Sequence, residues 1–105
     1  MPCDEDVVLV ISNTPDESLA THIAHLLVEE GLAACVNIGA SMRSVYRWKG
    51  EVASDEETPL MIKTTWSRHQ ALIRRLVELH PYEVPEAIVV PVLAGHEPYL
   101  KWVRE

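Results

Sequence analysis

A long stretch of strand-forming residues, 33–66, constrains the fold of this chain more than any other feature. Its first part, residues 33–48, contains no proline and no acidic residue, so nothing interrupts an extended strand. Lys49 and Gly50 follow, and a second apolar run begins at Leu60. A glycine-containing turn between two strand-forming runs is typical of a β-hairpin, because glycine readily adopts a positive φ. The sequence therefore predicts one long hairpin that turns at this glycine.

The predicted hairpin is too long to lie straight in a compact chain of this size. Its first arm has sixteen residues, which would span roughly 50 Å at about 3.3 Å per residue. A folded chain of about 100 residues has a radius of gyration near 13 Å and a diameter of about 34 Å. Either the hairpin bends at a bulge, or another subunit covers its tip. Residues 54–59 are acidic and end in Pro59, so we expect the return arm to break or bulge there, at a sheet edge.

Composition and charge narrow the possible functions. The chain has 105 residues, of which 48% are apolar and 24% charged, so we expect one globular domain over residues 1–105. No run approaches the roughly 18 apolar residues of a membrane span. The net charge is −7 without a lysine- or arginine-rich cluster, which disfavours nucleic acid and anionic membranes as partners. The acidic N-terminus is unlike a secretory signal, and two cysteines make no disulfide framework, so we expect a cytoplasmic protein.

The N-terminal third predicts a strand followed by a helix. Residues 7–11 form a short, continuous, β-branched run, which is typical of a central strand covered on both faces. Thr14 is the expected N-cap of the helix, with Pro15 at its first position and Glu17 completing a capping box. Gly31 is expected just past the helix end, where a positive φ is favoured.

The remaining elements complete an alternating order. Residues 60–65 read as a buried strand, and Ser67 with Gln70 predicts the capped start of a second helix that stops before Pro81. Residues 87–92 predict a fourth strand with an edge position, because it contains a proline. Residues 98–104 predict a last short helix.

The predicted order is βαββαβ with a C-terminal helix, which favours a ferredoxin-like α+β sandwich with both long helices on one sheet face. The first strand is apolar on both sides, yet no predicted element is left to cover the second face. We therefore expect the protein to self-associate.

Known catalytic signatures are absent from the sequence. It contains no glycine-rich phosphate loop, no C-x-x-C pair and no H-E-x-x-H motif. A soft-metal chaperone of this fold would need paired cysteines, and an acyl-phosphate hydrolase would need a phosphate-binding loop after the first strand. Both functions are disfavoured, and we expect no enzymatic activity.

The densest group of functional side chains lies in residues 80–86, where an imidazole, a phenol and two carboxylates are held between prolines. One interpretation is a rigid turn in which His80 caps the helix carbonyls. The other is a site for a cation or a small ligand. Lys63 lies inside an apolar strand, so it needs a partner, for which Glu57 and Glu86 are candidates. A structural ion pair and an anion-binding role both remain open for this lysine.

The chain resembles the CutA divalent-cation-tolerance family over essentially its whole length. The segments that carry the resemblance are 14–17, 33–37, Ser44, Tyr46, Trp48, Gly50, Glu57, 63–64, 80–82, 84–86 and 99–102. The resemblance implies a tight homotrimer, similar in architecture to the PII signalling proteins, in which long hairpins wrap around neighbouring subunits. It also implies tolerance of copper and other divalent cations, with no established reaction.

The resemblance also implies a copper site, but only part of it is present. In the best-known bacterial member the ligands are a cysteine at the end of the first strand and two adjacent histidines. The aligned positions here are Ser12, Leu79 and His80. A serine hydroxyl is a poor copper ligand and leucine is none, so we expect weak binding of copper or another divalent cation through His80.

Three functional hypotheses follow from the residues and the resemblance together. The first is a trimeric cation-binding tolerance protein. The second is a PII-like signalling trimer that binds a small molecule in an intersubunit cleft lined by Glu57, Lys63, Tyr82 and Glu86. An enzyme that uses the same cleft ranks last. In either of the first two, Tyr46 and Trp48 are expected to be anchors of the trimer interface.

Overall fold

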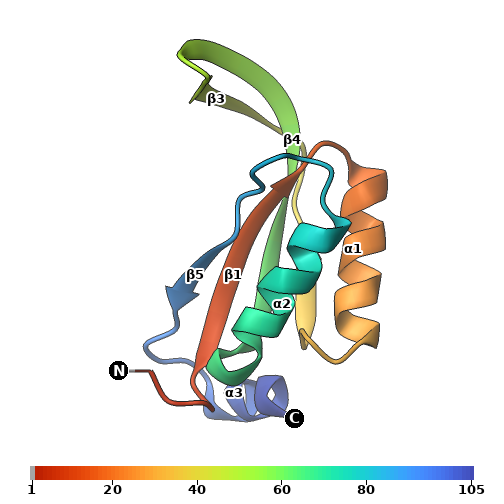
Figure 1. The fold of residues 1–105 in the computed structure, drawn as a ribbon. Coiled ribbons are helices and arrows are strands. Elements are labelled where there is room, and N and C mark those ends of the chain that lie inside the picture. Colours follow the sequence, from red (N-terminus) through yellow and green to blue (C-terminus); the bar gives the residue numbers. More distant parts are fainter. Residues whose placement is uncertain (1) are drawn as a thin grey trace.

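The computed structural model describes residues 2–105 and has one antiparallel sheet with three helices (Figure 1). Four strands lie in the order β2-β4-β1-β5, and β3 pairs with the outer part of β4. This order confirms the ferredoxin-like α+β fold expected from the sequence. The elements are β1 (Val7–Thr14), α1 (Glu17–Glu29), β2 (Cys35–Ile38), β3 (Met42–Trp48), β4 (Glu51–Thr65), α2 (Trp66–Leu79), β5 (Ile88–Pro91) and α3 (Glu97–Arg104).

The core lies between the sheet and the pair of helices α1 and α2, which cover the same sheet face (Figure 1). Side chains in a strand alternate between faces, and in β1 and β4 the buried set faces these helices. Its central members are fully buried: Val10, Ile23, Leu27, Leu60, Ile62, Leu72 and Leu76. Burying side chains of this kind contributes about 1.5–3 kcal/mol each.

The start of α1 lies two residues later than the sequence predicts. Asp16 is the N-cap, and its carboxylate accepts a hydrogen bond of 2.8 Å from the amide of Leu19. Thr14 stays in β1 opposite Thr58, and its hydroxyl donates to the Thr58 carbonyl oxygen at 2.9 Å. The predicted Thr14 cap is therefore wrong, because pairing with β4 keeps this threonine extended. Gly31 has φ +73° just past the helix, as predicted.

The other boundaries follow the prediction more closely. Helix α2 starts two residues earlier than predicted, with Thr65 rather than Ser67 in the N-cap position and no side-chain capping bond, so the predicted capping box is wrong. The helix ends before Pro81, as expected. Strand β5 lies at the sheet edge, which confirms the reading of its proline. Within residues 2–105, no helix is long and apolar enough to cross a membrane.

The long hairpin breaks in its first arm and not in its second. Strand β4 runs without interruption over 15 residues, whereas residues 39–41 separate β2 from β3. The predicted break at Pro59 therefore does not occur in β4, the strand that contains this proline. The break lies instead in the partner strand, where the Gly39 amide donates to the Pro59 carbonyl oxygen at 3.0 Å. Proline has no N–H with which to return a ladder bond, so pairing with β2 ends at this point.

Beyond this break, β3 and the outer part of β4 form a two-stranded arm, residues 42–57, that curves away from the body of the sheet (Figure 1). The arm turns at Lys49 and Gly50, which both have positive φ. The molecule extends over 43 × 28 × 23 Å. The hairpin thus bends, which is one of the two alternatives that its length left open.

Most of the sheet face opposite α1 and α2 is open within this chain, while α3 contacts β1 and β4 where Val7 and Thr65 are buried. Met61, Ile88 and Val90 are exposed on it, in register with Leu9 and Ile11 of the central strand β1. This arrangement bears out the expectation that the chain leaves its second sheet face uncovered. Coverage by another subunit stays a prediction.

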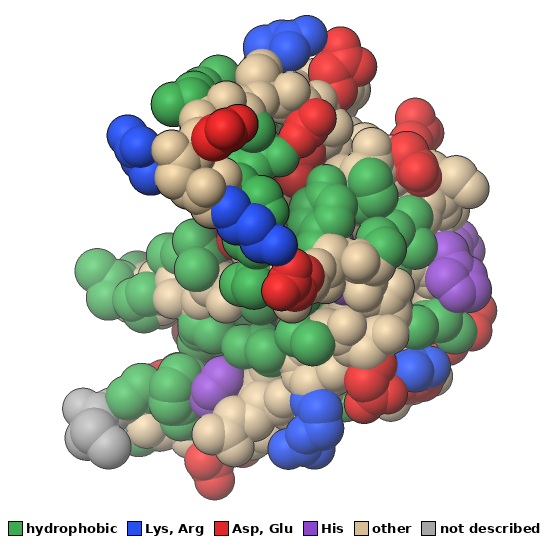
Figure 2. Space-filling model, turned by 45° about the horizontal axis from the view of Figure 1, so that its top comes forward, with side chains coloured by type: hydrophobic (Ala, Val, Ile, Leu, Met, Phe, Trp, Pro, Cys, Tyr) green, Lys and Arg blue, Asp and Glu red, His purple; other side chains and the backbone are tan. Residues whose placement is uncertain are grey.

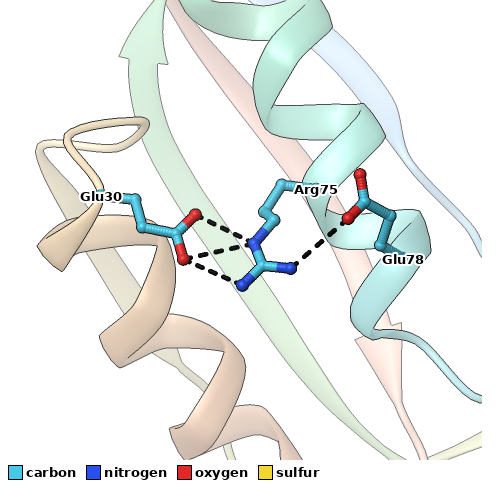
Figure 3. Close-up of polar contacts among 3 residues, drawn as sticks. All are labelled: Glu30, Arg75 and Glu78. Carbon is cyan, nitrogen blue, oxygen red and sulfur yellow. Dashed lines mark hydrogen bonds and ion pairs between the residues drawn. The ribbon is translucent and has the colours of Figure 1, made fainter.

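One ion-pair group joins the two helices on the covered face (Figure 3). The Arg75 guanidinium of α2 donates to both carboxylate oxygens of Glu30, at the end of α1, and contacts Glu78 at 3.4 Å. Hydrogen bonding to this guanidinium lowers the pKa of the Glu30 carboxyl from its ordinary value. The group therefore ties the end of α1 to α2.

Candidate functional site

The loop over residues 80–86 meets the arm within one chain. The Tyr82 hydroxyl donates a hydrogen bond of 2.9 Å to the Glu57 carboxylate of β4. Nearer the arm tip, the Lys49 ammonium lies 3.8 Å from the Glu83 carboxylate. The sequence places hairpin and loop far apart, and the fold brings them together. We call the region formed by the side chains of His80, Tyr82, Glu57, Tyr46 and Asp55 the junction.

His80 is held at the junction through both of its ring nitrogens. Its Nε2–H donates to the carbonyl oxygen of Asn13 at 2.6 Å, and its Nδ1 accepts from the amide of Tyr82 at 3.2 Å. These partners require the neutral imidazole with its proton on Nε2. The side chain is 7% exposed. Its ring therefore joins the end of β1 to the loop. His80 is also the C-cap residue of α2, but it bonds the Val77 carbonyl oxygen through its backbone amide, at 3.3 Å, and not through its imidazole.

Two phenol–carboxylate pairs make up the rest of the junction. Burial, followed by the hydrogen bond to Glu57, raises the pKa of Tyr82 to about 12. Tyr46 in β3 donates to Asp55 across the arm, and this bond raises the pKa of its phenol as well. The ring of Tyr82 also packs on that of His80, with centroids 4.5 Å apart. Both phenols are thus kept protonated as donors to carboxylates.

The other two residues predicted for the cleft lie elsewhere. Glu86 accepts a hydrogen bond of 2.9 Å from the Asn13 side chain at the end of β1. Lys63 donates to the Asn37 side chain of β2, whereas Glu57 and Glu86 accept from Tyr82 and Asn13, so the predicted ion pair does not form within the described residues of one chain. Lys63 lies six positions after Glu57 in β4, which is about 20 Å along the strand. Within one chain, only Glu57 and Tyr82 of the four are in contact.

Near the junction, two buried oxygens lack a partner among the described residues. Ser12 is fully buried on the helix side of β1 and its hydroxyl makes no hydrogen bond, and the side-chain oxygen of Asn13 is also unpaired. Leu79 packs against the core. Across residues 2–105, no three histidine, cysteine, aspartate or glutamate side chains gather closely enough to hold a metal ion.

A hollow of about 480 Å³ lies on the other side of the arm base. The start of α1 contributes Asp16 and Glu17 to its lining, β4 contributes Glu56, and residues 38–41 form the opposite wall. Sequence reasoning missed this hollow because it depends on the break between β2 and β3. It equally missed Asn13, Asn37 and Asp55, whose roles follow from strand register and have no local sequence signal.

Comparison with known proteins identifies the family. The family model described as CutA1 divalent ion tolerance protein matches residues 8–105. The chain belongs to this family.

Individual members are similar over most of this chain. The divalent-cation tolerance protein CutA of Thermus thermophilus is 48% identical over 101 residues, 96% of each chain. Human protein CutA is 47% identical over 91 residues, and the chain spans about half (51%) of its length. The crystal structure of CutA from Xylella fastidiosa superposes with a TM-score of 0.91 at 45% identity, covering 93% of this chain and 94% of that one.

Membership confirms the resemblance to the CutA family drawn from the sequence. The names of the matched family model and of the Thermus thermophilus protein describe tolerance of divalent ions and state no reaction. Two further relatives carry a location in their names, chloroplastic in Arabidopsis thaliana and periplasmic in Archaeoglobus fulgidus.

Proposed function

We propose that the protein is a homotrimeric divalent-cation tolerance protein that binds copper or another divalent cation weakly through His80 and catalyses no reaction. The observation that carries the assembly is the arm, which presents large apolar side chains to solvent. Val45 and Val52 are 68% and 70% exposed, and Trp48 and Tyr46 are exposed beside them. Figure 2 shows hydrophobic side chains spread over much of one face, between scattered charges.

A further copy of this chain is the occupant that fits these surfaces. The open face of the sheet and the arm are both apolar, and burying exposed apolar area stabilises association at about 25 cal/mol per Å². The arm also extends beyond the body of its own chain. The body therefore cannot cover the outer side of the arm, and only another subunit could do so. In such a trimer Tyr46 and Trp48 become interface anchors, and Lys63 on the open face comes to line an intersubunit cleft.

Light scattering tests the assembly directly. We expect a mass of three times the 11.8 kDa chain. A mass equal to one chain at micromolar concentration would contradict the trimer.

The geometry at His80 supports weak cation binding. Because both ring nitrogens are engaged, a cation has to displace one hydrogen bond before it can be ligated. Nδ1 is the better candidate, since its bond to the Tyr82 amide, at 3.2 Å, is the longer of the two. Carboxylates of the same loop, Glu83 and Glu86, are suitable additional ligands for a divalent cation. Ser12 and Leu79 add no strong ligand at the family's other positions.

Titration calorimetry with Cu²⁺ and Zn²⁺ tests this site. The experiment should use a Cys3→Ser background, because an exposed thiol binds soft metals. We expect binding tighter than millimolar that His80→Ala removes and that His22→Ala, at an exposed histidine on α1, leaves unchanged. Equal binding in all three proteins would contradict a role for His80.

A second candidate function is a PII-like trimer that binds a small anionic molecule in the intersubunit cleft. The contact between Glu57 and Tyr82, together with Lys63 on the open face, favours it. A thermal-shift screen of small anions against wild type and Lys63→Met separates this function from cation binding. An anion that stabilises the wild type but not Lys63→Met would support this second function. If no anion stabilises the wild type through Lys63, only the proposed cation binding remains. The cytoplasmic location expected from the sequence remains a prediction.

A further inference from the structure

The arm has little support from the body of its own chain. Pairing between β1 and β4 ends at Thr14 and Thr58, and beyond this point β4 pairs only with β3. A two-stranded ribbon is marginally stable alone and twists strongly. Its direction relative to the body therefore depends on whatever other contacts reach it.

In the part of the chain that the structure describes, two polar contacts link arm and body. One is the ion pair between Lys49 and Glu83, whose side chains are 72% and 71% exposed. Such exposed pairs contribute little to stability. The other is the hydrogen bond from the Tyr82 hydroxyl to Glu57. A neutral donor to a carboxylate makes one of the stronger hydrogen bonds. Tyr82 is 37% exposed and Glu57 is half-buried, so this bond is less exposed than the ion pair and is the stronger of the two contacts.

Tyr82 is itself held firmly on the body side. Pro81 and Pro85 restrict the backbone of its loop. Its amide donates to His80 Nδ1, its ring packs on the same imidazole, and Nε2 of that imidazole donates to the Asn13 carbonyl oxygen. A continuous series of contacts thus runs from the end of β1 through the two rings to the arm.

We propose that Tyr82 is a positioning residue that holds the arm in one direction before subunits meet, and so strengthens their association. This inference rests on the homotrimer proposed above. Fixing a segment in its bound conformation lowers the entropy that association must overcome. Because each subunit contributes one arm, the effect is repeated three times in a trimer.

The test compares Tyr82→Phe with Tyr99→Phe. Both tyrosines are similarly exposed, and Tyr99 makes no side-chain hydrogen bond among the described residues, so it is a matched control. The first readout is amide hydrogen exchange over residues 42–57. We expect exchange there to rise about fivefold in Tyr82→Phe, the value of one typical hydrogen bond, with little change in the core strands.

The second readout is subunit exchange, followed by mass spectrometry after isotopically labelled and unlabelled protein are mixed. We expect mixed trimers of Tyr82→Phe to form several-fold faster than those of wild type and of Tyr99→Phe. Glu57→Gln keeps an acceptor oxygen and should lie between wild type and Glu57→Leu.

The outcomes separate this inference from the proposed trimer. Unchanged hydrogen exchange in the arm of Tyr82→Phe would overturn the positioning role, whatever the oligomeric state. Faster arm exchange with unchanged subunit exchange would overturn the link to association. A monomeric wild type would refute the trimer and the link together, while the exchange data would still decide whether Tyr82 holds the arm.

Discussion

The substitution Gly39→Ala tests the physical reason for the break in the hairpin. A Cβ added at Gly39 would lie 2.7 Å from Cγ of Pro59 and 3.6 Å from its Cδ. Carbon atoms in contact sit at about 3.5–4.0 Å, so the methyl group overlaps the ring by roughly 1 Å. The ring belongs to the β4 backbone and cannot rotate away, and the hydrogen bond from Gly39 to the Pro59 carbonyl oxygen holds the two residues together.

The clash should outweigh the gain that an alanine brings. Overpacking of this kind costs about 1–3 kcal/mol, whereas replacing glycine by alanine stabilises by about 0.4–1 kcal/mol through the unfolded chain. The net expectation is a loss of about 1–2 kcal/mol. In a domain of about 100 residues, this lowers the melting temperature by roughly 4–15 °C.

Thermal and urea unfolding of both proteins, at one fixed protein concentration, measures this loss. Gly95→Ala is the matched control, because its added methyl meets only the flexible end of Leu100, at 3.3 Å. Pro59→Ala in the Gly39→Ala background should restore part of the stability through a favourable coupling energy. If Gly39→Ala unfolds like wild type, or if the double variant shows no coupling, the steric account of the break is wrong.

Three further predictions address individual side chains. Ser12→Ala removes a fully buried hydroxyl without a partner and should raise the free energy of unfolding by about 1 kcal/mol; a lower urea midpoint would refute this. The pKa of Tyr82 is raised to about 12 from 10.0, because the folded protein favours the protonated phenol. This preference stabilises the fold below pH 10, and the stabilisation is lost as the pH rises through 12. Absorbance titration of Tyr82→Phe should therefore lack a phenolate step seen in wild type at the highest pH. The pKa of Glu30 is lowered from 4.5, because Arg75 favours the ionised carboxylate in the folded protein. This preference stabilises the fold above pH 4.5, and the stabilisation is lost as the pH falls through the pKa of the folded protein. Arg75→Gln should therefore be less stable than wild type at neutral pH, and chemical denaturation should show the difference shrinking in acid.

The order of elements was predictable because it rests on local patterns. The apolar run at residues 7–11 and Gly31 past the first helix each carry enough local information to place an element. Boundaries that depend on distant partners were not predictable in this way. Thr14 and Asp16 are both good cap residues, and the choice between them is made by Thr58, which lies 44 residues further on and keeps Thr14 in the sheet.

The position of the break in the hairpin also depends on a residue in another strand. Pro59 correctly indicated that strand pairing stops. The interruption lies in the partner strand, however, because Pro59 lacks an N–H for that strand and its ring would meet a side chain at Gly39. Sequence reasoning assigned the interruption to Pro59's own strand, since it had no register with which to find the partner.

The candidate site could be predicted only in part. The prolines and the mixed side chains of residues 80–86 drew attention to the loop, but its meeting with the hairpin was expected between subunits, whereas Tyr82 contacts Glu57 within one chain. The partners of Lys63 and His80 are set by strand register and by the end of β1. Asn37 and Asn13 fill these roles, and neither carries a charge that would have drawn attention to it.

The uninterrupted course of β4 has a consequence for how chains of this architecture can change in length. One strand serves the body and the arm, so loss or gain of a single residue within it would reverse the facing of every side chain on one side of the change. Leu60 and Ile62 would leave the core, or Glu57 would turn away from the loop. The gap at residues 39–41 has no such constraint, apart from the glycine that faces Pro59. Insertions that survive selection should therefore collect at that gap and in the loops, while β4 keeps a constant number of residues.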